Sequence, residues 1–309
     1  MKTSDYPYYK CQFSEFNKAQ QLVVPFFDKD TNLVISLNTG TGKTALAECI
    51  FGYHLNTSDT AKVVYVSPFK SISAEKRAEW AYDLHPFYDY GVLLCNGDNV
   101  PEKEEWQQSR VVLITYESLD SKTRNRKNDW IKDVACFVFD EAHMLGQEDR
   151  GPCVEACLMR VSAINPNARI VFLSGTMGNA RQLAQWLKVL NNKRTHFIES
   201  DWKPVKTIVN FHSYDDTIGF GKSEAEKLSV LYGILKHTHA SQKTVVFVHS
   251  KRMGKVIVDF LRSKKIKTAF HNSGATPKMR AQLEEAFRDE NSGFNVLIST
   301  STLSAGVNL

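Results

Sequence analysis

The chain has 309 residues, a length that favours two domains at roughly 100–200 residues each. Apolar residues make up 42% and charged residues 24% of the sequence, which is ordinary globular usage and argues against a disordered chain. The formal net charge of +5 permits a polyanionic partner without requiring one.

Membrane and secretory segments are not indicated by the sequence. No stretch approaches the roughly 20 apolar residues that a membrane-spanning helix needs, and the N-terminus lacks the apolar core of a signal peptide. The six cysteines include no CxxC pair. They favour reduced, structural thiols in a cytoplasmic or nuclear protein over a metal–cysteine site.

Short apolar runs and helical segments alternate along the chain. The runs are rich in Val, Ile or Phe and predict strands buried on both faces, at Leu33–Leu37, Val63–Val66, Gly91–Leu94, Val111–Ile114, Cys136–Phe139, Ile170–Leu173, Val245–Val248, Lys267–Phe270 and Val296–Ile298. Apolar spacing of three and four predicts helices at Ala45–Leu55, Ile72–Leu84, Val154–Ile164, Asn179–Val189, Lys251–Ser263 and Pro277–Asp289. This alternation predicts an α/β fold with parallel sheets covered by helices on both faces.

The alternation pauses once, and we place a domain boundary there. Residues 201–222 contain a Trp-Lys-Pro turn and two glycines, with little regular pattern. We therefore expect a first lobe over residues 1–200, a linker over 201–222 and a partial second lobe over 223–309. The second half shows three clear strands and stops just after one of them, so we expect it to be cut short.

A phosphate-binding loop is predicted where the first strand meets the first long helix. Glycines allow a tight turn whose N–H groups face an anion, and the helix that follows presents its positive end to the same anion. Lys43 would reach the β- and γ-phosphates, and the Thr44 hydroxyl would bind Mg²⁺. The sequence departs from the common pattern at Leu37, where glycine is usual. The candidate nucleotide-binding residues are Thr39, Gly40, Thr41, Gly42, Lys43 and Thr44.

A second chemical signal follows the strand Cys136–Phe139, which runs into Asp140-Glu141-Ala142-His143. A carboxylate at the tip of a rigid buried strand suits a second Mg²⁺ ligand, which we assign to Asp140. Glu141, one residue on, could orient or deprotonate an attacking water. Because ligands of open α/β sheets bind at the carboxyl ends of the strands, both acidic residues fall where a nucleotide site is expected.

With these residues the chain resembles the superfamily-2 helicases over nearly its whole length. Further motifs of that superfamily have counterparts here, at Gln20 (Q motif, with Phe13 or Phe16 to stack nearby), Ser67–Ile72 (Ia), Asn96–Asp98 (the Gly-Asp turn), Thr115–Asp120 (Ib), Ser174–Thr176 (III), Val245–Lys251 (IV), His271–Gly274 and Ser299–Leu309 (V). Details within Asp140–Gly146, Arg150–Pro152, Ser174–Asn179 and Trp202–Val205 look like the Ski-like group of RNA helicases and archaeal-type DNA-repair helicases.

The resemblance implies two RecA-like lobes, the second incomplete, that use ATP and Mg²⁺. It implies that Gln20 reads adenine, and that Gly306 and Asn308 of motif V also face the nucleotide. It further implies that His143, Ser174 and Thr176 couple the phosphate site to the strand-binding face. The candidate contacts to a nucleic-acid strand, each at or beside a strand's carboxyl end, are Lys70, Thr115, Ser250 and Thr300.

Three functions compete at this point. The leading one is an ATP-dependent helicase or translocase on single-stranded or partly duplex nucleic acid, with DNA slightly favoured over RNA and no role for a membrane. The alternative is an ATP-gated nucleic-acid-binding module with little catalysis of its own. A small-molecule kinase would share the phosphate loop but would not need the other motifs. Because no arginine in these residues matches motif VI, we expect the 309-residue chain to hydrolyse ATP only weakly.

Overall fold

The computed structural model describes residues 1–125, 129–175, 177–215, 217, 219–236, 242–289, 292–300 and 303. The chain forms two compact units, Met1–Lys206 and Thr207–Leu309, and the division between them falls within the segment 201–222. Each unit is built on a parallel sheet with helices on both faces, so the predicted α/β fold is confirmed.

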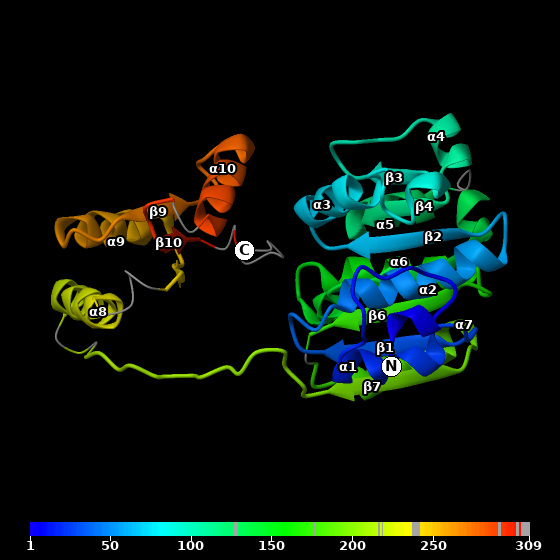
Figure 1. The fold of residues 1–309 in the computed structure, drawn as a ribbon, viewed down its shortest axis with the longest axis horizontal. Helices are drawn as coiled ribbons and strands as arrows, with labels where there is room; N and C mark the ends of the chain where they lie inside the picture. Colours follow the sequence, from blue (N-terminus) through cyan, green and yellow to red (C-terminus); the bar gives the residue numbers. More distant parts are fainter. Residues whose placement is uncertain are drawn as a thin grey trace. The chain divides into compact units, whose positions relative to one another are not determined.

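The first unit contains a parallel sheet whose strand order is β3-β4-β2-β5-β6-β1-β7 (Figure 1). Its strands are β1 (Asn32–Leu37), β2 (Lys62–Ser67), β3 (Val92–Cys95), β4 (Val111–Thr115), β5 (Val134–Phe139), β6 (Arg169–Ser174) and β7 (Thr195–Ser200). Most of these strands are buried along their whole length, which explains why they read as unbroken apolar runs.

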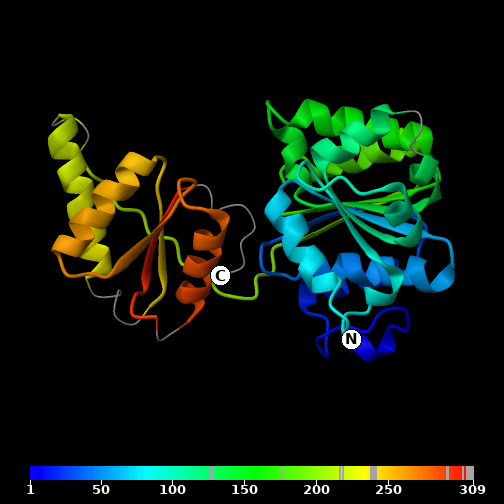
Figure 2. The same cartoon turned by 90° about the horizontal axis from the view of Figure 1, so that it is seen from above.

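Helices cover both faces of this sheet (Figure 2). They are α1 (Lys18–Gln21), α2 (Lys43–Thr57), α3 (Lys70–Trp80), α4 (Lys103–Gln108), α5 (Tyr116–Arg124), α6 (Gly151–Ile164) and α7 (Ala180–Asn191). Strand side chains alternate between two cores. Leu33 and Ile35 pack with α2 and the N-terminal segment, whereas Val34 packs with α5, α6 and α7.

The second unit has a smaller parallel sheet with the order β8-β10-β9. Its strands are β8 (Thr244–Phe247), β9 (Thr268–His271) and β10 (Val296–Ser299), and its helices are α8 (Phe220–Leu235), α9 (Lys251–Ser263) and α10 (Pro277–Arg288). Alternate strand residues again divide between two faces. Val246 and Ile298 pack with α8 and α9, whereas Val245 and Leu297 pack with Phe287 of α10.

Several elements were not predicted from the apolar pattern. Strand β7 lies at the sheet edge and is only partly buried, so polar residues interrupt it. Helices α1, α4 and α5 are short, and α8 begins inside the segment interpreted as a linker.

Across the described parts of the chain, we find no helix with the length and apolar character that crossing a bilayer requires.

Candidate functional site

The carboxyl ends of three neighbouring strands of the first unit bring the main candidates together. Strands β5, β6 and β1 are adjacent and parallel, so their carboxyl ends meet at one edge of the sheet. The loop 38–42 follows β1, Asp140 follows β5, and Ser174 closes β6. Residues that are about a hundred positions apart in sequence therefore share one edge.

The loop after β1 has the backbone of an anion cradle. Gly40 and Gly42 have φ values of 79° and 76°, in the left-handed region that glycine adopts without a Cβ penalty. A Cβ on Gly42 would also lie 2.6 Å from Nε2 of Gln20, so a larger residue would displace the Gln20 amide in addition to adopting a strained φ. Helix α2 then starts at Lys43 without a side-chain cap, which leaves its positive end for an anion.

Lys43 lies over its own loop. Its Nζ donates to the carbonyl oxygens of Leu37 and Asn38 at 3.2 and 3.4 Å. The departure from the common glycine pattern at Leu37 has a simple structural reason. Leu37 is the last residue of β1 and is fully buried in the core on the α2 face, so the position belongs to the strand here.

Gln20 approaches the same loop from helix α1. Asn17 caps that helix, and its side-chain amide also donates to the carbonyl of Thr41 at 3.0 Å. The Gln20 amide donates to the carbonyl of Gly42 at 3.3 Å. Of the two aromatic candidates nearby, Phe16 is buried in the core whereas Phe13 is partly exposed. Phe13 is therefore the more accessible ring for stacking.

Asp140 is held from several directions at the tip of β5. Its Oδ2 accepts from the Tyr65 hydroxyl at 2.6 Å, and its Oδ1 accepts from the N–H of Glu141 at 2.9 Å. Its carbonyl accepts from the Tyr116 hydroxyl at 2.7 Å, and its N–H donates to Val66 of the neighbouring strand. Two hydrogen bonds therefore fix the carboxylate of Asp140, and two more fix its backbone.

Glu141 is set at a sharp turn in the backbone, with a φ of 52°, an unusual value for a residue with a side chain. Burial is the main cause that raises the pKa of its carboxyl group, and the neighbouring Asp140 raises it further, whereas Lys43 and His143 act in the opposite direction. A carboxylate with a raised pKa is the better proton acceptor near neutral pH.

His143 connects the acidic pair to the neighbouring strand. Its Nδ1 lies 3.2 Å from Oε2 of Glu141 and 3.1 Å from Oγ of Ser174, the last residue of β6. Ser36, on β1 before the phosphate loop, donates to the carbonyl of Gly175 and accepts from the N–H of Met177. Predicted site residues Thr176, Gly306 and Asn308 lie outside the residues that the structure describes.

Comparison with known families identifies the family of the chain. Residues 17–183 match the DEAD/DEAH box helicase family, and residues 226–309 match the helicase conserved C-terminal domain. The chain belongs to the DEAD/DEAH box helicase family. The predicted resemblance to superfamily-2 helicases is thereby confirmed, and family membership implies the use of ATP.

Similar proteins place the chain near the Ski-like helicases, as predicted. It is 28% identical to Activating signal cointegrator 1 complex subunit 3 of Danio rerio (96% of this chain, 22% of that protein). It is 29% identical to the ATP-dependent DNA helicase Hel308 of Pyrococcus horikoshii (91% and 42%) and 24% identical to the RQC trigger complex helicase SLH1 of Saccharomyces cerevisiae (96% and 17%). The chain thus spans less than half the length of these relatives.

A solved structure supports the fold of this helicase chain. Dbp5 of S. cerevisiae, bound to Gle1 and IP6, matches with a TM-score of 0.65 over 96% of this chain and 72% of that chain, at 22% identity. At that identity the match concerns the fold alone. It supports the RecA-like description of the two parallel sheets.

The predicted strand-contact residues of this helicase chain lie in different settings. Lys70 pairs with Asp98 of the Gly-Asp turn, at 2.7 Å. Thr115 caps helix α5 and is buried, with its hydroxyl donating to Ser118. In the second unit, Ser250 follows β8, caps α9 and is exposed. Thr300 follows β10 and is buried.

The structure adds functional neighbours that the sequence motifs did not reveal. Tyr65 and Tyr116 hold Asp140, and Asn17 joins the Q-motif helix to the phosphate loop. Arg150 donates to the carbonyl of Pro68 at 2.7 Å and pairs with Glu117, so it links motifs Ia and Ib. The sequence offers one signal for Tyr65, which is a single tyrosine within the largely aliphatic strand β2. The partner of Tyr65 cannot be named from the sequence, because that requires the order of the strands.

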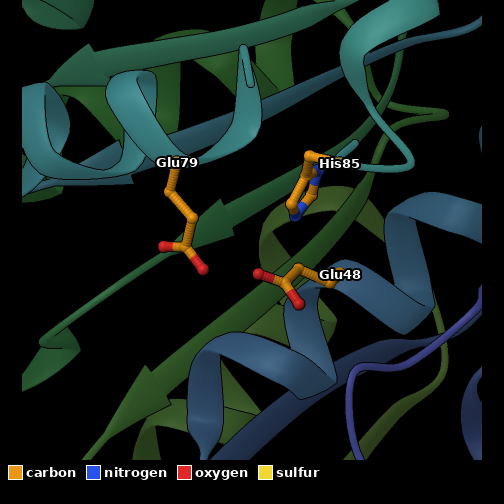
Figure 3. A group of neighbouring side chains, drawn as sticks. All are labelled: Glu48, Glu79 and His85. Carbon is orange, nitrogen blue, oxygen red and sulfur yellow. The ribbon is translucent and has the colours of Figure 1, made fainter. Parts of the chain in front are cut away.

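A second cluster of acidic and imidazole groups lies elsewhere in the first unit, where Glu48 on α2 faces Glu79 and His85 (Figure 3). The Glu48 oxygens accept from Trp80 Nε1 at 2.9 Å and from the Tyr9 hydroxyl at 3.0 Å. His85 Nδ1 accepts from a backbone N–H, which leaves the proton on Nε2. Both Glu48 oxygens and Nδ1 of His85 are thus engaged within the protein, so we interpret Glu48 and His85 as part of a buried polar network, with the exposed Glu79 beside it.

The phosphate loop and the acidic pair fit ATP and Mg²⁺. The left-handed glycines leave a backbone cradle that a Cβ would fill, and α2 presents an uncapped N-terminus. A hydroxyl at Thr44 and a carboxylate at Asp140 are hard oxygen donors, the kind that Mg²⁺ prefers. The residues present are therefore the right chemical types for both groups.

Proposed function

We propose that this chain is the ATP-hydrolysing motor of a nucleic-acid helicase or translocase. The observation that carries the proposal is the common edge of one sheet, where the glycine cradle, Lys43 and the Asp140–Glu141 pair follow neighbouring strands. A small-molecule kinase would need the cradle but not the His143–Ser174 link beside it. Family membership supports the same conclusion.

In the proposed reaction, Lys43 leaves its loop carbonyls and neutralises phosphate charge, while the loop N–H groups hold the phosphate oxygens. Thr44 and Asp140 hold Mg²⁺, which neutralises charge on the phosphate oxygens when bound. Glu141 orients the attacking water and accepts its proton, and its raised pKa supports that role. Gln20 contacts adenine, and Gly306 and Asn308 are proposed further nucleotide contacts.

Coupling is proposed to run through His143, Ser174 and Thr176. His143 lies within hydrogen-bond reach of both Glu141 and Ser174, so a change at Glu141 alters the end of β6 directly. Ser36 connects the following turn to β1 and hence to the phosphate loop. These contacts support a physical link between the phosphate site and the motif that follows β6.

The substrate is proposed to be a single-stranded or partly duplex nucleic acid, contacted through its phosphates by Lys70, Thr115, Ser250 and Thr300. Such contacts position a strand without reading its sequence. DNA is slightly favoured, since the archaeal relative is named a DNA helicase.

We also propose lobe boundaries at 1–200, 201–222 and 223–309. The proposed location is cytoplasmic or nuclear, and the 309 residues alone are proposed to hydrolyse ATP only weakly.

The proposal is tested by measuring ATP hydrolysis by this chain with no nucleic acid and with matched DNA and RNA oligonucleotides. We expect slow hydrolysis, stimulated by single strands, and binding that weakens steeply with salt because phosphate contacts release counterions. Hydrolysis without any response to a strand contradicts the helicase assignment. ATP-dependent strand binding without hydrolysis supports a nucleic-acid-binding module instead.

A further inference from the structure

Tyr65 lies beside Asp140, a proposed magnesium ligand, and belongs to none of the motifs described above. It sits within strand β2, next to β5, and is almost fully buried, with 1% of its surface exposed. Its hydroxyl donates to Oδ2 of Asp140 at 2.6 Å.

The direction of this bond follows from the number of protons. A phenol carries one proton, and the Tyr65 proton goes to Oδ2 of Asp140. Oδ1 of the same carboxylate accepts from the N–H of Glu141 at 2.9 Å. A carboxylate oxygen has more than one lone pair, so lone pairs of Asp140 remain for a cation.

We propose that Tyr65 is a positioning residue that orients the Asp140 carboxylate as a magnesium ligand. The inference rests on the proposed nucleotide site and adds a residue behind this metal ligand. Partners of this kind fix the orientation of the groups that bind a metal, and their loss typically weakens metal affinity about 10–100-fold. Tyr65 itself touches neither nucleotide nor cation.

A matched control residue exists in the same structure. Tyr116 is also almost fully buried, and its hydroxyl donates to the backbone carbonyl of Asp140 at 2.7 Å. Both phenols therefore secure the same residue, but only Tyr65 contacts its carboxylate. If the phenols merely stabilise the end of β5, removal of either hydroxyl has the same effect.

The test measures, by calorimetry, how a non-hydrolysable ATP analogue binds the 309-residue chain at a series of Mg²⁺ concentrations. For Tyr65→Phe we expect unchanged analogue affinity in EDTA, and a Mg²⁺ midpoint raised about 10–100-fold over wild type. Tyr116→Phe should leave the midpoint unchanged. In an Asp140→Asn background, Tyr65→Phe should shift the midpoint much less, because its partner carboxylate is gone.

Each other result overturns the inference. An unchanged midpoint in Tyr65→Phe, or an equal shift in Tyr116→Phe, shows that Tyr65 does not act on the Asp140 carboxylate. The phenylalanine ring keeps the edge contact with Trp80, at 5.5 Å between centroids, so a folded variant is expected. A variant that fails to fold would assign the phenol a structural role. If the wild-type chain itself shows no Mg²⁺-dependent binding, the proposed nucleotide site is wrong.

Discussion

At the scale of single residues, Lys43 and Glu141 have different proposed roles. In the proposed reaction Lys43 offers a cation to the phosphates, whereas Glu141 orients the attacking water, and both residues follow strands that end at the same edge of the sheet. Lys43→Ala should therefore abolish ATP binding. Glu141→Gln should keep ATP and Mg²⁺ binding but lose roughly 10²–10⁴-fold in hydrolysis, the usual contribution of general-base catalysis.

Equilibrium nucleotide binding and single-turnover hydrolysis, measured on both variants, separate these two roles. Equal loss of binding in Lys43→Ala and Glu141→Gln would contradict the assignment. Glutamine is the appropriate replacement because it keeps the size of the side chain at a backbone position with positive φ, where a change of shape adds strain of its own.

Glu48 gives a pH-dependent contribution to stability. Burial is the main cause that raises its pKa from 4.5 to about 7, although Lys76, Trp80 and Tyr9 all act against the shift. Between these pH values the unfolded chain has released the proton and the folded chain keeps it, so the free energy of unfolding falls as pH rises. The total loss from this group is about 3 kcal/mol, and it is complete once pH exceeds the folded pKa.

Glu48→Gln mimics the protonated carboxyl group and should remove this part of the pH dependence. Urea unfolding at pH 5 and pH 7.5 measures the difference in both proteins. The wild-type chain should lose more stability than the variant between the two conditions. Parallel losses would mean that Glu48 is ionised throughout, and that the network around Trp80 and Tyr9 stabilises its charge.

The sequence identifies the proposed nucleotide contacts more readily than the residues that support them. Lys43 and Asp140 stand in motifs whose chemistry can be named from spacing alone. Tyr65 could not be assigned, because its partner is fixed by the pairing of β2 with β5, and strand order is not written in the local sequence. The same holds for Asn38, whose amide donates to the carbonyl of Trp202.

At the scale of elements, Arg169, the first residue of β6, is hydrogen-bonded to the turn that precedes β1. It is fully buried, and its guanidinium donates to the carbonyls of Phe26, Phe27 and Thr31 at 2.6, 2.9 and 2.9 Å. Arg169→Met removes the side-chain donor from the carbonyls of Phe27 and Thr31, whereas the carbonyl of Phe26 keeps the N–H of Lys29. We expect a loss of about 3 kcal/mol or more in the free energy of unfolding, since each buried unpaired group costs about 1–3 kcal/mol.

Urea unfolding of Arg169→Met checks this value, and Arg181→Met is the control. Arg181 is exposed on α7 and lies over the Phe197 ring, so its replacement should change stability by no more than about 0.5 kcal/mol. Similar stabilities for the two variants would show that the turn before β1 holds without its guanidinium.

Elements were predicted from the sequence in proportion to how completely they are buried. Strands β1, β2, β4 and β6 are buried throughout and read as apolar runs. Edge strand β7 is only partly buried and contains polar residues, so it does not stand out as an apolar run in the sequence. Helix α5 was read only as a motif, because motif Ib polar residues occupy much of its length.

At the scale of the whole molecule, the first unit contains its own two cores and every contact described around the phosphate loop. A chain of residues 1–206 should therefore fold alone and bind ATP with Mg²⁺, although more weakly than the 309-residue chain, because the proposed contacts of Gly306 and Asn308 are lost. Thermal unfolding and calorimetric binding test this. A folded 1–206 chain that does not bind ATP would show that residues after 206 are required for the nucleotide site.

The two-unit plan was foreseeable because strand–helix alternation pauses once along the chain. The order of seven strands in the first sheet was not foreseeable from periodicity, since crossover connections allow many orders with the same local pattern. What the alternation does establish is that carboxyl ends of parallel strands share one edge. That rule is enough to gather the phosphate loop and the acidic pair, but not to name their supporting side chains.

The contact between the phosphate loop and the end of the first unit has an optical consequence. Asn38 donates to the carbonyl of Trp202 at 3.2 Å, and Pro204 lies against Gly40. The Trp202 indole is partly buried and packs on the core next to that loop. In a variant whose other four of the five tryptophans are replaced by phenylalanine, the fluorescence emission of Trp202 should shift when nucleotide binds at the loop. The emission of Trp202 would then report nucleotide binding without an added label.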